Sequence, residues 1–97
     1  MDLTGTRVAL FGLGDQVEYS MEFADALGML HEQLETRGAE LVGYWPTAGY
    51  AYEFSKADLG DSRFCGLVLD QDNQPEQTPR RLAAWIAGIR PNLLAAV

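Results

Sequence analysis

A short glycine-rich run, Gly12-Leu13-Gly14-Asp15-Gln16, follows the apolar segment 7–11 and is the part of the sequence best suited to contact a ligand. Glycine lets a backbone approach a flat ring closely, and Asp15 can accept hydrogen bonds from ring or imide N–H groups. Tyr19 offers an aromatic face for stacking. These residue types predict recognition of a planar ring, although the spacing of the two glycines taken alone favours an ordinary tight turn.

The same run does not match the glycine patterns that bind phosphate groups. It contains only G-x-G, without the third glycine of a dinucleotide fingerprint and without the Lys-Ser/Thr of a Walker loop. In open α/β sheets, however, ligands bind outside the carboxyl ends of the strands, and this run comes directly after a predicted strand. Its position therefore supports ligand contact more than its spacing does.

The other residues that could carry chemistry favour structural interpretations. The chain has one cysteine and one histidine, which excludes a Cys/His metal cluster. Cys65 lies in an apolar run and is predicted to be buried and inert, and His31 is predicted to be a surface or boundary residue of a helix. Asp70, Asp72 and Asn73 could bind a cation, but a polar loop after a strand is the favoured interpretation.

Strands alternate with amphipathic helices along the chain. Apolar runs predict strands at 7–11, 41–45 and 64–69, with a polar interruption at 47–63. Helical spacing predicts one helix from an N-cap at Ser20 to Arg37 and another from Thr78 to Pro91, followed by a loose tail at 92–97. Trp45 and Trp85 are predicted core aromatics. This order indicates a parallel sheet with right-handed crossovers, and two helices are too few to cover both faces of a whole sheet.

Composition narrows the classes of partner. The 97 residues carry 14 carboxylates against 7 Lys and Arg, a formal net charge of -7. This acidity argues against nucleic acid and anionic membranes and favours a basic partner surface, although it also serves solubility alone. The sequence contains neither an apolar run of membrane-spanning length nor a signal segment, which predicts a cytoplasmic location.

Several separated motifs, in consistent order from about Gly5 to Pro91, resemble long-chain flavodoxins. Phe11 to Gln16, with Tyr19 and Phe23, resembles the flavin loop of that family. Residues 42–50 resemble its fifth strand and family-specific insertion, and 64–74 resemble the second part of that strand and the loop after it. The resemblance implies a flavodoxin-like α/β fold in which residues 1–97 form the C-terminal part of the parallel sheet and its flanking helices. The N-terminal phosphate-binding half would then be absent.

The resemblance implies an FMN-dependent, low-potential electron carrier and not an enzyme. Its partners would be basic-faced redox proteins of the reductase or nitrogenase type. Tyr19 would stack on the isoalloxazine, and Asp15, with backbone groups of Leu13 and Gly14, would contact the pyrimidine edge. A nearby carboxylate and an apolar stacked ring both disfavour a second negative charge on the reduced flavin, which lowers the last reduction potential.

The same resemblance implies roles for two further residues, and the sequence departs from the family's pattern in two places. Gln16 would shape the loop and Asp72 would lie near the flavin. Glu18 stands where the family usually has glycine, and a side chain there would cost about 1–3 kcal/mol if the backbone φ were positive. The phosphate-binding loop, rich in Ser, Thr and Gly, is missing, so weak or absent FMN binding is expected for this chain alone.

Two alternatives to a working electron carrier stay open at this point. Glu18 supports a cofactor-free flavodoxin-like half-domain that acts as an assembly or interaction module. The short list of elements supports a half-domain that completes its sheet by pairing with another copy or with a separate N-terminal half. The exposed edge of the first strand, 7–11, would be the pairing site.

Overall fold

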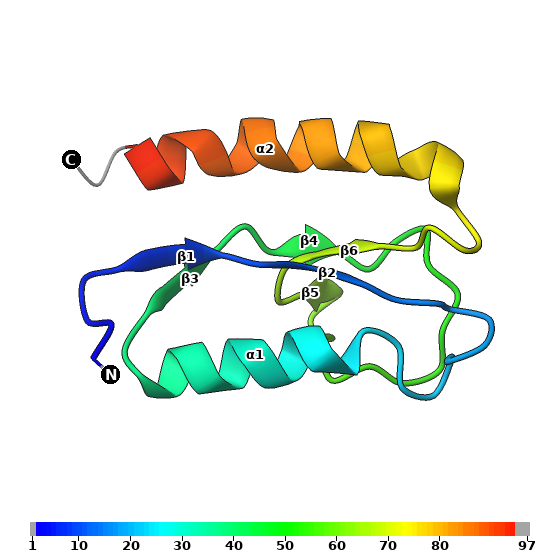
Figure 1. The fold of residues 1–97 in the computed structure, drawn as a ribbon, viewed down its shortest axis with the longest axis horizontal. Coiled ribbons are helices and arrows are strands. Elements are labelled where there is room, and N and C mark those ends of the chain that lie inside the picture. Colours follow the sequence, from blue (N-terminus) through cyan, green and yellow to red (C-terminus); the bar gives the residue numbers. More distant parts are fainter. Residues whose placement is uncertain (1, 95–97) are drawn as a thin grey trace.

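The computed structural model describes residues 2–94. The elements in chain order are β1 (Arg7–Ala9), β2 (Phe11–Leu13), α1 (Asp25–Thr36), β3 (Glu40–Val42), β4 (Trp45–Pro46), β5 (Arg63–Phe64), β6 (Leu67–Leu69), the 3-10 helix η1 (Pro75–Gln77) and α2 (Thr78–Leu94). The strands form a middle layer with α1 on one face and α2 on the other (Figure 1). Within the described part of the chain, no helix combines the length and the apolar character needed to cross a membrane.

Residues 7–13 form one extended strand that contains both β1 and β2, and we call it the central strand because it runs between α1 and α2 (Figure 1). It has two successive partners. β1 pairs in parallel with β3, with Arg7 opposite Glu40. β2 pairs in parallel with β6, with Phe11 opposite Leu67. The chain between these partners, residues 43–66, forms an insertion. The parallel pairing and the two flanking helices confirm the parallel α/β arrangement predicted from the order of elements.

The side chains of the central strand alternate between two cores. Val8 and Leu10 point toward α1, where Phe23 and Leu27 complete the larger cluster. Ala9 points the other way, into a cluster that α2 closes with aromatic and aliphatic side chains. The period-two alternation of a strand therefore places consecutive residues in different cores. Both tryptophans take part as predicted, since Trp85 is buried and Trp45 packs against both clusters.

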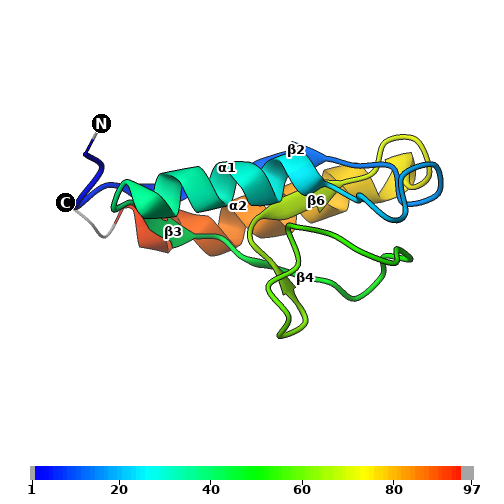
Figure 2. The same cartoon turned by 90° about the horizontal axis from the view of Figure 1, so that it is seen from below.

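Aromatic rings order the insertion, although its sequence shows no regular period. The Phe23 ring centroid lies 5.9 Å from that of Tyr50, 5.3 Å from that of Tyr52 and 6.0 Å from that of Phe64. The Tyr50 hydroxyl also donates to the Val68 carbonyl at 2.6 Å. Figure 2 shows the insertion standing out to one side of the two helices, near the label β4. The aromatic side chains of the insertion thus cover the hydrophobic core that lies between the strands and α1.

The first helix begins later than the sequence predicted. Ser20 does not cap it, because the Ser20 carbonyl accepts hydrogen bonds from the backbone N–H groups of Glu53 and Phe54 in the insertion. The chain instead turns through residues 16–24, and Ala24 occupies the N-cap position with φ 55° and no side-chain hydrogen bond. A tertiary contact therefore displaces the helix start to Asp25.

The second helix continues past its predicted end. Pro91 was expected to terminate it, yet α2 includes Pro91 and runs to Leu94. A proline this close to the C-terminal end disrupts only the last turn, and Arg7 Nη1 donates to the Asn92 carbonyl at 2.5 Å in that turn. The predicted loose tail is therefore wrong for residues 92–94. Residues 95–97 lie outside the described residues.

Cys65 is buried as predicted, with 1% of its surface exposed. Burial raises the pKa of its thiol to about 11, and its Sγ lies 3.7 Å from the Leu27 carbonyl oxygen. Since the thiolate is the reactive form, we expect modification by Ellman's reagent at pH 8 to be about 100-fold slower in the native chain than in the urea-unfolded chain. Absorbance at 412 nm measures both rates. Equal rates would show that the thiol is accessible in the native state.

Candidate functional site

Two polar loops meet where β2 and β6 end. These strands are parallel neighbours, so their carboxyl ends lie at the same edge, and the Gly14 N–H donates to the Leu69 carbonyl at 3.0 Å. We call residues 14–19, which follow β2, the ring loop, and residues 70–74, which follow β6, the support loop. The ring loop contains four of the residues predicted from sequence to contact a ligand, Gly14, Asp15, Gln16 and Tyr19. Gly12 and Leu13, which were predicted to belong to the loop, lie in β2 instead.

Asp70 in the support loop holds the two loops together. Its side chain is fully buried, and Oδ2 accepts from the Gln16 N–H at 3.0 Å and from Gln16 Nε2 at 2.7 Å. Oδ1 accepts from the Asn73 N–H at 2.9 Å, and Asn73 Nδ2 lies within 3.1 Å of both oxygens. Burial alone would raise the pKa of Asp70, but the hydrogen bonds from Gln16 and Asn73 outweigh it and hold the pKa below its ordinary value.

Gln16 joins the ring loop to a third segment. Its side chain is buried, and Oε1 accepts from the Ala51 N–H of the insertion at 2.6 Å. Both ends of the Gln16 amide are therefore engaged, one with Asp70 and one with the insertion. A side chain held at both ends in this way fixes the path of the ring loop at Gln16.

Asp15 organises the exposed part of the ring loop. Its Oδ1 accepts from the Glu18 N–H at 2.9 Å, from Asn73 Nδ2 at 2.8 Å and from the Val17 N–H at 3.1 Å. These hydrogen bonds, the one from Glu18 foremost, lower the pKa of the Asp15 carboxyl. An ionised Asp15 thus keeps the turn closed and connects it to the support loop.

Glu18 is not strained, which corrects the expectation drawn from the sequence. Among residues 2–94, the non-glycine residues with positive φ are Ala24 and Ser62, so Glu18 occupies a backbone conformation open to any residue. The turn seen here therefore does not require glycine at this position. Backbone strain at Glu18 therefore gives no reason to expect a loss of ligand binding.

The ring loop presents an uncovered apolar surface beside a shallow hollow. The Tyr19 side chain is 62% exposed and Leu13 is 67% exposed. A hollow of about 290 Å³ lies against the start of α1, and its lining residues are Leu13, Gly14, Asp15, Tyr19, Glu22, Ala24, Asp25 and Ala26. Asp72 is exposed in the support loop, two residues after Asp70. Five of the six predicted site residues therefore belong to the ring loop or the strand end before it, and Asp72 belongs to the loop that supports it.

The residues at this edge fit a flat ring better than a phosphate group. Three acidic residues, Asp15, Glu22 and Asp25, are among those that line the hollow, and their negative charges would repel a phosphate dianion. Tyr19 supplies an exposed aromatic face for a planar ligand. These features fit the isoalloxazine part of FMN. The phosphate would need donors from elsewhere.

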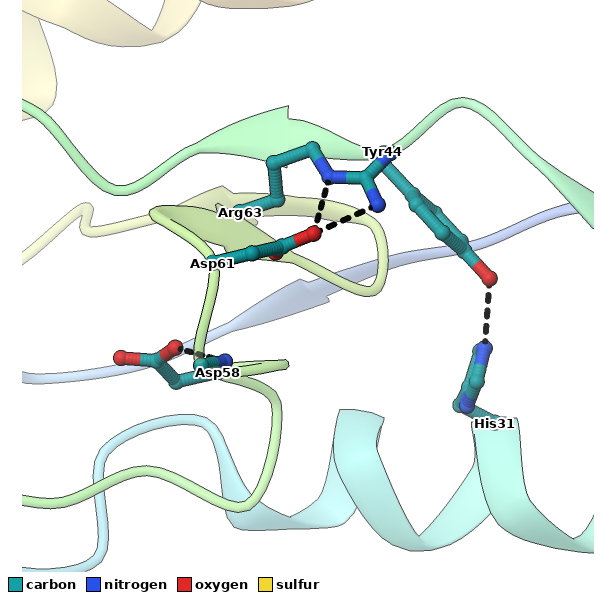
Figure 3. Close-up of polar contacts among 6 residues, drawn as sticks. His31, Tyr44, Asp58, Asp61 and Arg63 are labelled. Atoms are coloured by element: carbon teal, nitrogen blue, oxygen red, sulfur yellow. Dashed lines mark hydrogen bonds and ion pairs between the residues drawn. The ribbon is translucent and has the colours of Figure 1, made fainter.

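A second polar cluster lies away from the ring loop and fastens the insertion to α1 (Figure 3). His31 Nε2 lies 3.1 Å from the Tyr44 hydroxyl oxygen, and the Arg63 guanidinium lies 5.0 Å from the centre of the Tyr44 ring. Arg63 also forms an ion pair with Asp61 at 2.7 Å. His31 is only 7% exposed, so its predicted surface or boundary position is wrong, because the insertion brings Tyr44 over it. This cluster borders a larger hollow of about 470 Å³ between residues 41–45 and α2.

Sequence reasoning missed Asp70, which it treated as one member of a polar loop. The available signal was its place directly after the run 64–69, all of whose residues the structure buries. A carboxylate that directly continues a fully buried strand must find hydrogen-bond donors, and here Gln16 and Asn73 supply them.

Comparison with known proteins identifies relatives of this chain. A family model described as Flavodoxin matches residues 1–85. The flavodoxin of a Picosynechococcus species is 48% identical over 91 residues, which cover 94% of this chain and 53% of that protein. Flavodoxin 1 of Escherichia coli is 48% identical over 93 residues, which cover 96% of this chain and 53% of that protein. The chain thus spans about half the length of the curated relatives that it matches.

Two solved structures share the fold. A mutant flavodoxin of Fusobacterium nucleatum bound to flavin mononucleotide superposes with a TM-score of 0.89 at 36% identity, covering 95% of this chain and 54% of that one. A second structure of Fusobacterium nucleatum flavodoxin bound to flavin mononucleotide gives a TM-score of 0.84 at 35% identity, with 95% and 55% covered. These matches confirm the flavodoxin-like α/β fold predicted from the sequence.

Proposed function

This chain belongs to the flavodoxin family, and on that premise we propose that it forms the ring-binding part of an FMN-dependent, low-potential electron carrier. The observation that carries the proposal is the ring loop, held in place by buried Asp70 and presenting an exposed Tyr19 beside an acidic hollow. The two similar solved structures bind flavin mononucleotide. Electron transfer without catalysis of a substrate reaction is the function that this family membership supports.

Each residue of the edge has a distinct role in the proposal. Tyr19 stacks on the outer face of the ring, while Asp15 and the backbone of Leu13 and Gly14 face its pyrimidine edge. Gln16 does not contact the ring through its amide, because both ends of that amide are engaged within the protein. Asp72 contributes negative charge near the flavin from the support loop.

The charges around the hollow support a low reduction potential. FMN would supply the redox chemistry when bound, and an electron added without a proton would make its ring more negative. The acidic residues Asp15, Glu22 and Asp25 are among those that line the hollow, and their negative charges disfavour that added charge. The net charge of -7 in turn favours redox partners with a basic surface, such as a reductase or a nitrogenase-type protein.

The proposal predicts that the chain binds a flavin ring with or without its phosphate. We expect FMN and lumiflavin, which lacks the ribityl phosphate, to bind with dissociation constants within about threefold of each other, because carboxylates and no phosphate cradle line the hollow. Both affinities are expected to be weak. Quenching of flavin fluorescence, with the chain titrated to about 1 mM, measures them.

Two variants of one residue test the stacking role. Tyr19→Ala is expected to weaken lumiflavin binding about fivefold or more, and Tyr19→Phe, which keeps the ring, is expected to retain it. Tyr19 is exposed, so neither variant removes a core contact. Equal affinity of all three proteins would contradict the assignment. Absence of quenching by either flavin would favour the cofactor-free interaction module instead.

A further inference from the structure

The larger hollow, between residues 41–45 and α2, has aromatic walls, and we call it the α2 hollow. Its volume of about 470 Å³ is typical of small-molecule sites. Tyr44 and Trp45 line it from the strand side, and Trp85 lines it from the helix side. Tyr44 and Trp45 are half-buried, so each leaves part of its surface accessible to a ligand. Aromatic faces in this arrangement favour a flat, largely apolar molecule.

The inner end of the α2 hollow is held in place by the protein itself. Trp85 Nε1 donates to the Gly43 carbonyl at 2.7 Å, which fixes the indole. Gly43 has φ 78°, and a Cβ there would lie 2.7 Å from Ile89 Cγ2 and 2.9 Å from Trp85 Nε1. The helix therefore packs directly on the backbone at residue 43. A site with fixed walls binds its ligand at a smaller entropic cost than one that must first be ordered.

Gly88 leaves the α2 hollow open on the helix side. It lines the hollow three residues after Trp85, and a Cβ at this position would meet no atom within 4 Å. A side chain larger than hydrogen would therefore extend into open space without displacing another residue. Ala84, about one turn earlier, is also small and lines the same hollow. The space is thus available to a ligand.

Among the described residues that line the α2 hollow, Arg63 alone carries a charge. Its guanidinium lies 5.0 Å from the centre of the Tyr44 ring, so the positive charge is placed at the aromatic wall (Figure 3). Nε and Nη2 of Arg63 donate to Asp61 Oδ2 at 3.0 and 2.7 Å. Both partners of this ion pair are about half exposed, which limits its strength, and Asp61 does not line the hollow. Because a guanidinium has five N–H donors, Arg63 can also bind a second carboxylate.

Charge distinguishes the α2 hollow from the hollow beside the ring loop. Three acidic residues are among those that line the hollow beside the ring loop, whereas the α2 hollow has Arg63. The described residues that line one hollow are all different from those that line the other. The net charge of -7 disfavours anions over the surface as a whole. An anionic ligand therefore favours the α2 hollow over the ring loop.

We propose that the α2 hollow binds a small planar aromatic molecule that carries one carboxylate group. The ring system lies against Trp45 and Trp85, beside Gly88, and the carboxylate accepts hydrogen bonds from the Arg63 guanidinium. The aromatic walls select for the ring, and the cation selects for the charge. This inference goes beyond flavin binding and electron transfer, and it depends on neither.

Binding of indole-3-acetate tests the proposal, and indole-3-acetamide is the uncharged comparison. The chain contains two tryptophans, so its heteronuclear NMR spectrum has two indole N–H signals. We expect indole-3-acetate to shift the Trp85 indole signal and the Gly88 amide signal, with a dissociation constant of about 1 mM. Indole-3-acetamide should bind about fivefold or more weakly, because it lacks the charge that pairs with Arg63. The amides of Gly14 and Tyr19 report on the ring loop and should not shift.

Variants at Gly88 and Arg63 separate the two parts of the site. Gly88→Leu fills the open space and is expected to weaken indole-3-acetate binding about tenfold or more, while leucine, a better helix former than glycine, preserves α2. Arg63→Gln is expected to weaken binding about fivefold or more. Arg80→Gln is the matched control, because it makes the same change at an exposed position of α2 outside the hollow, and its effect should stay within about twofold. Circular dichroism verifies that each variant folds.

Four results would overturn the inference. One is the absence of any shift of the Trp85 signal at about 10 mM indole-3-acetate. Another is equal affinity for the acetate and the acetamide, which would remove the role of Arg63. The third is unchanged binding by Gly88→Leu, and the fourth is a larger shift at Gly14 and Tyr19 than at Trp85, which would place the ligand at the ring loop. Flavin is absent from these measurements, so this inference and the ring-binding proposal can fail separately.

Discussion

Replacing Asp70 with asparagine is expected to lower the free energy of unfolding by about 3 kcal/mol. The two oxygens of Asp70 accept hydrogen bonds from Gln16 and Asn73, and the residue is fully buried. Asparagine keeps one acceptor oxygen, and in either orientation its NH₂ group faces at least two donors. Urea unfolding followed by tryptophan fluorescence measures the change.

Asp72→Asn is the matched control for this prediction. It makes the same chemical change two residues away, at an exposed position, and should alter the free energy of unfolding by no more than about 0.5 kcal/mol. If Asp70→Asn were as mild as this control, the hydrogen bonds from Gln16 and Asn73 would not be holding the two loops together.

The pH dependence of stability gives the same prediction a second readout. The pKa of Asp70 is lower in the folded chain than its ordinary value near 3.8. Its contribution to stability is therefore fully present above that ordinary value and is lost as the pH falls through the folded-state pKa. The unfolding free energy of the unmodified chain should decline below about pH 4, and Asp70→Asn should lack that part of the decline.

Replacing Gly28 with alanine is expected to destabilise the fold by about 2 kcal/mol, although alanine is the better helix former. A Cβ at Gly28 would lie 2.2 Å from the Lys56 carbonyl oxygen and 2.3 Å from its carbonyl carbon. These are backbone atoms, so no rotamer change relieves the overlap. The insertion would have to move away from α1, and the packing around Phe23 would loosen with it. Urea unfolding measures the loss.

The opposite result is expected for Gly88→Ala in the second helix. A Cβ at Gly88 meets no atom within 4 Å, so only the gain in helix propensity is left, worth about 0.5–1 kcal/mol of added stability. The two substitutions are chemically identical and both lie within helices. Stabilisation of both variants would show that the insertion backbone does not pack tightly on α1.

The strands and the order of elements were predictable because they depend on local patterns. The apolar runs predicted as strands at 7–11, 41–45 and 64–69 overlap β1, β3 and β6, since buried parallel strands need continuous apolar residues. Their bounds were wrong, because each run is divided between two strands in the structure. The ring loop was predictable for a related reason: it stands directly after β2. Features of this kind can be recognised without knowing which distant segments will meet.

The errors at Ser20, His31 and Asp70 share a different physical cause, which is contact with the insertion or with a distant loop. Ser20 fails as a helix cap because its carbonyl serves residues of the insertion, and His31 is buried because Tyr44 covers it. Asp70 is bonded to Gln16, 54 positions away in the sequence. Neither periodicity nor capping rules contain such information, and the aromatic packing that orders the insertion has no regular spacing to detect.

The central strand pairs first with β3 and then with β6, and this arrangement affects how the fold tolerates changes in chain length. β3 ends opposite Ala9 and β6 begins opposite Phe11, so the second partner resumes the ladder one residue after the first leaves it. Both partners preserve the same inward and outward alternation. A single insertion or deletion event between them in evolution would therefore leave the sheet unshifted. Its cost would fall on the packing around the buried ring of Phe23 and not on the strand register.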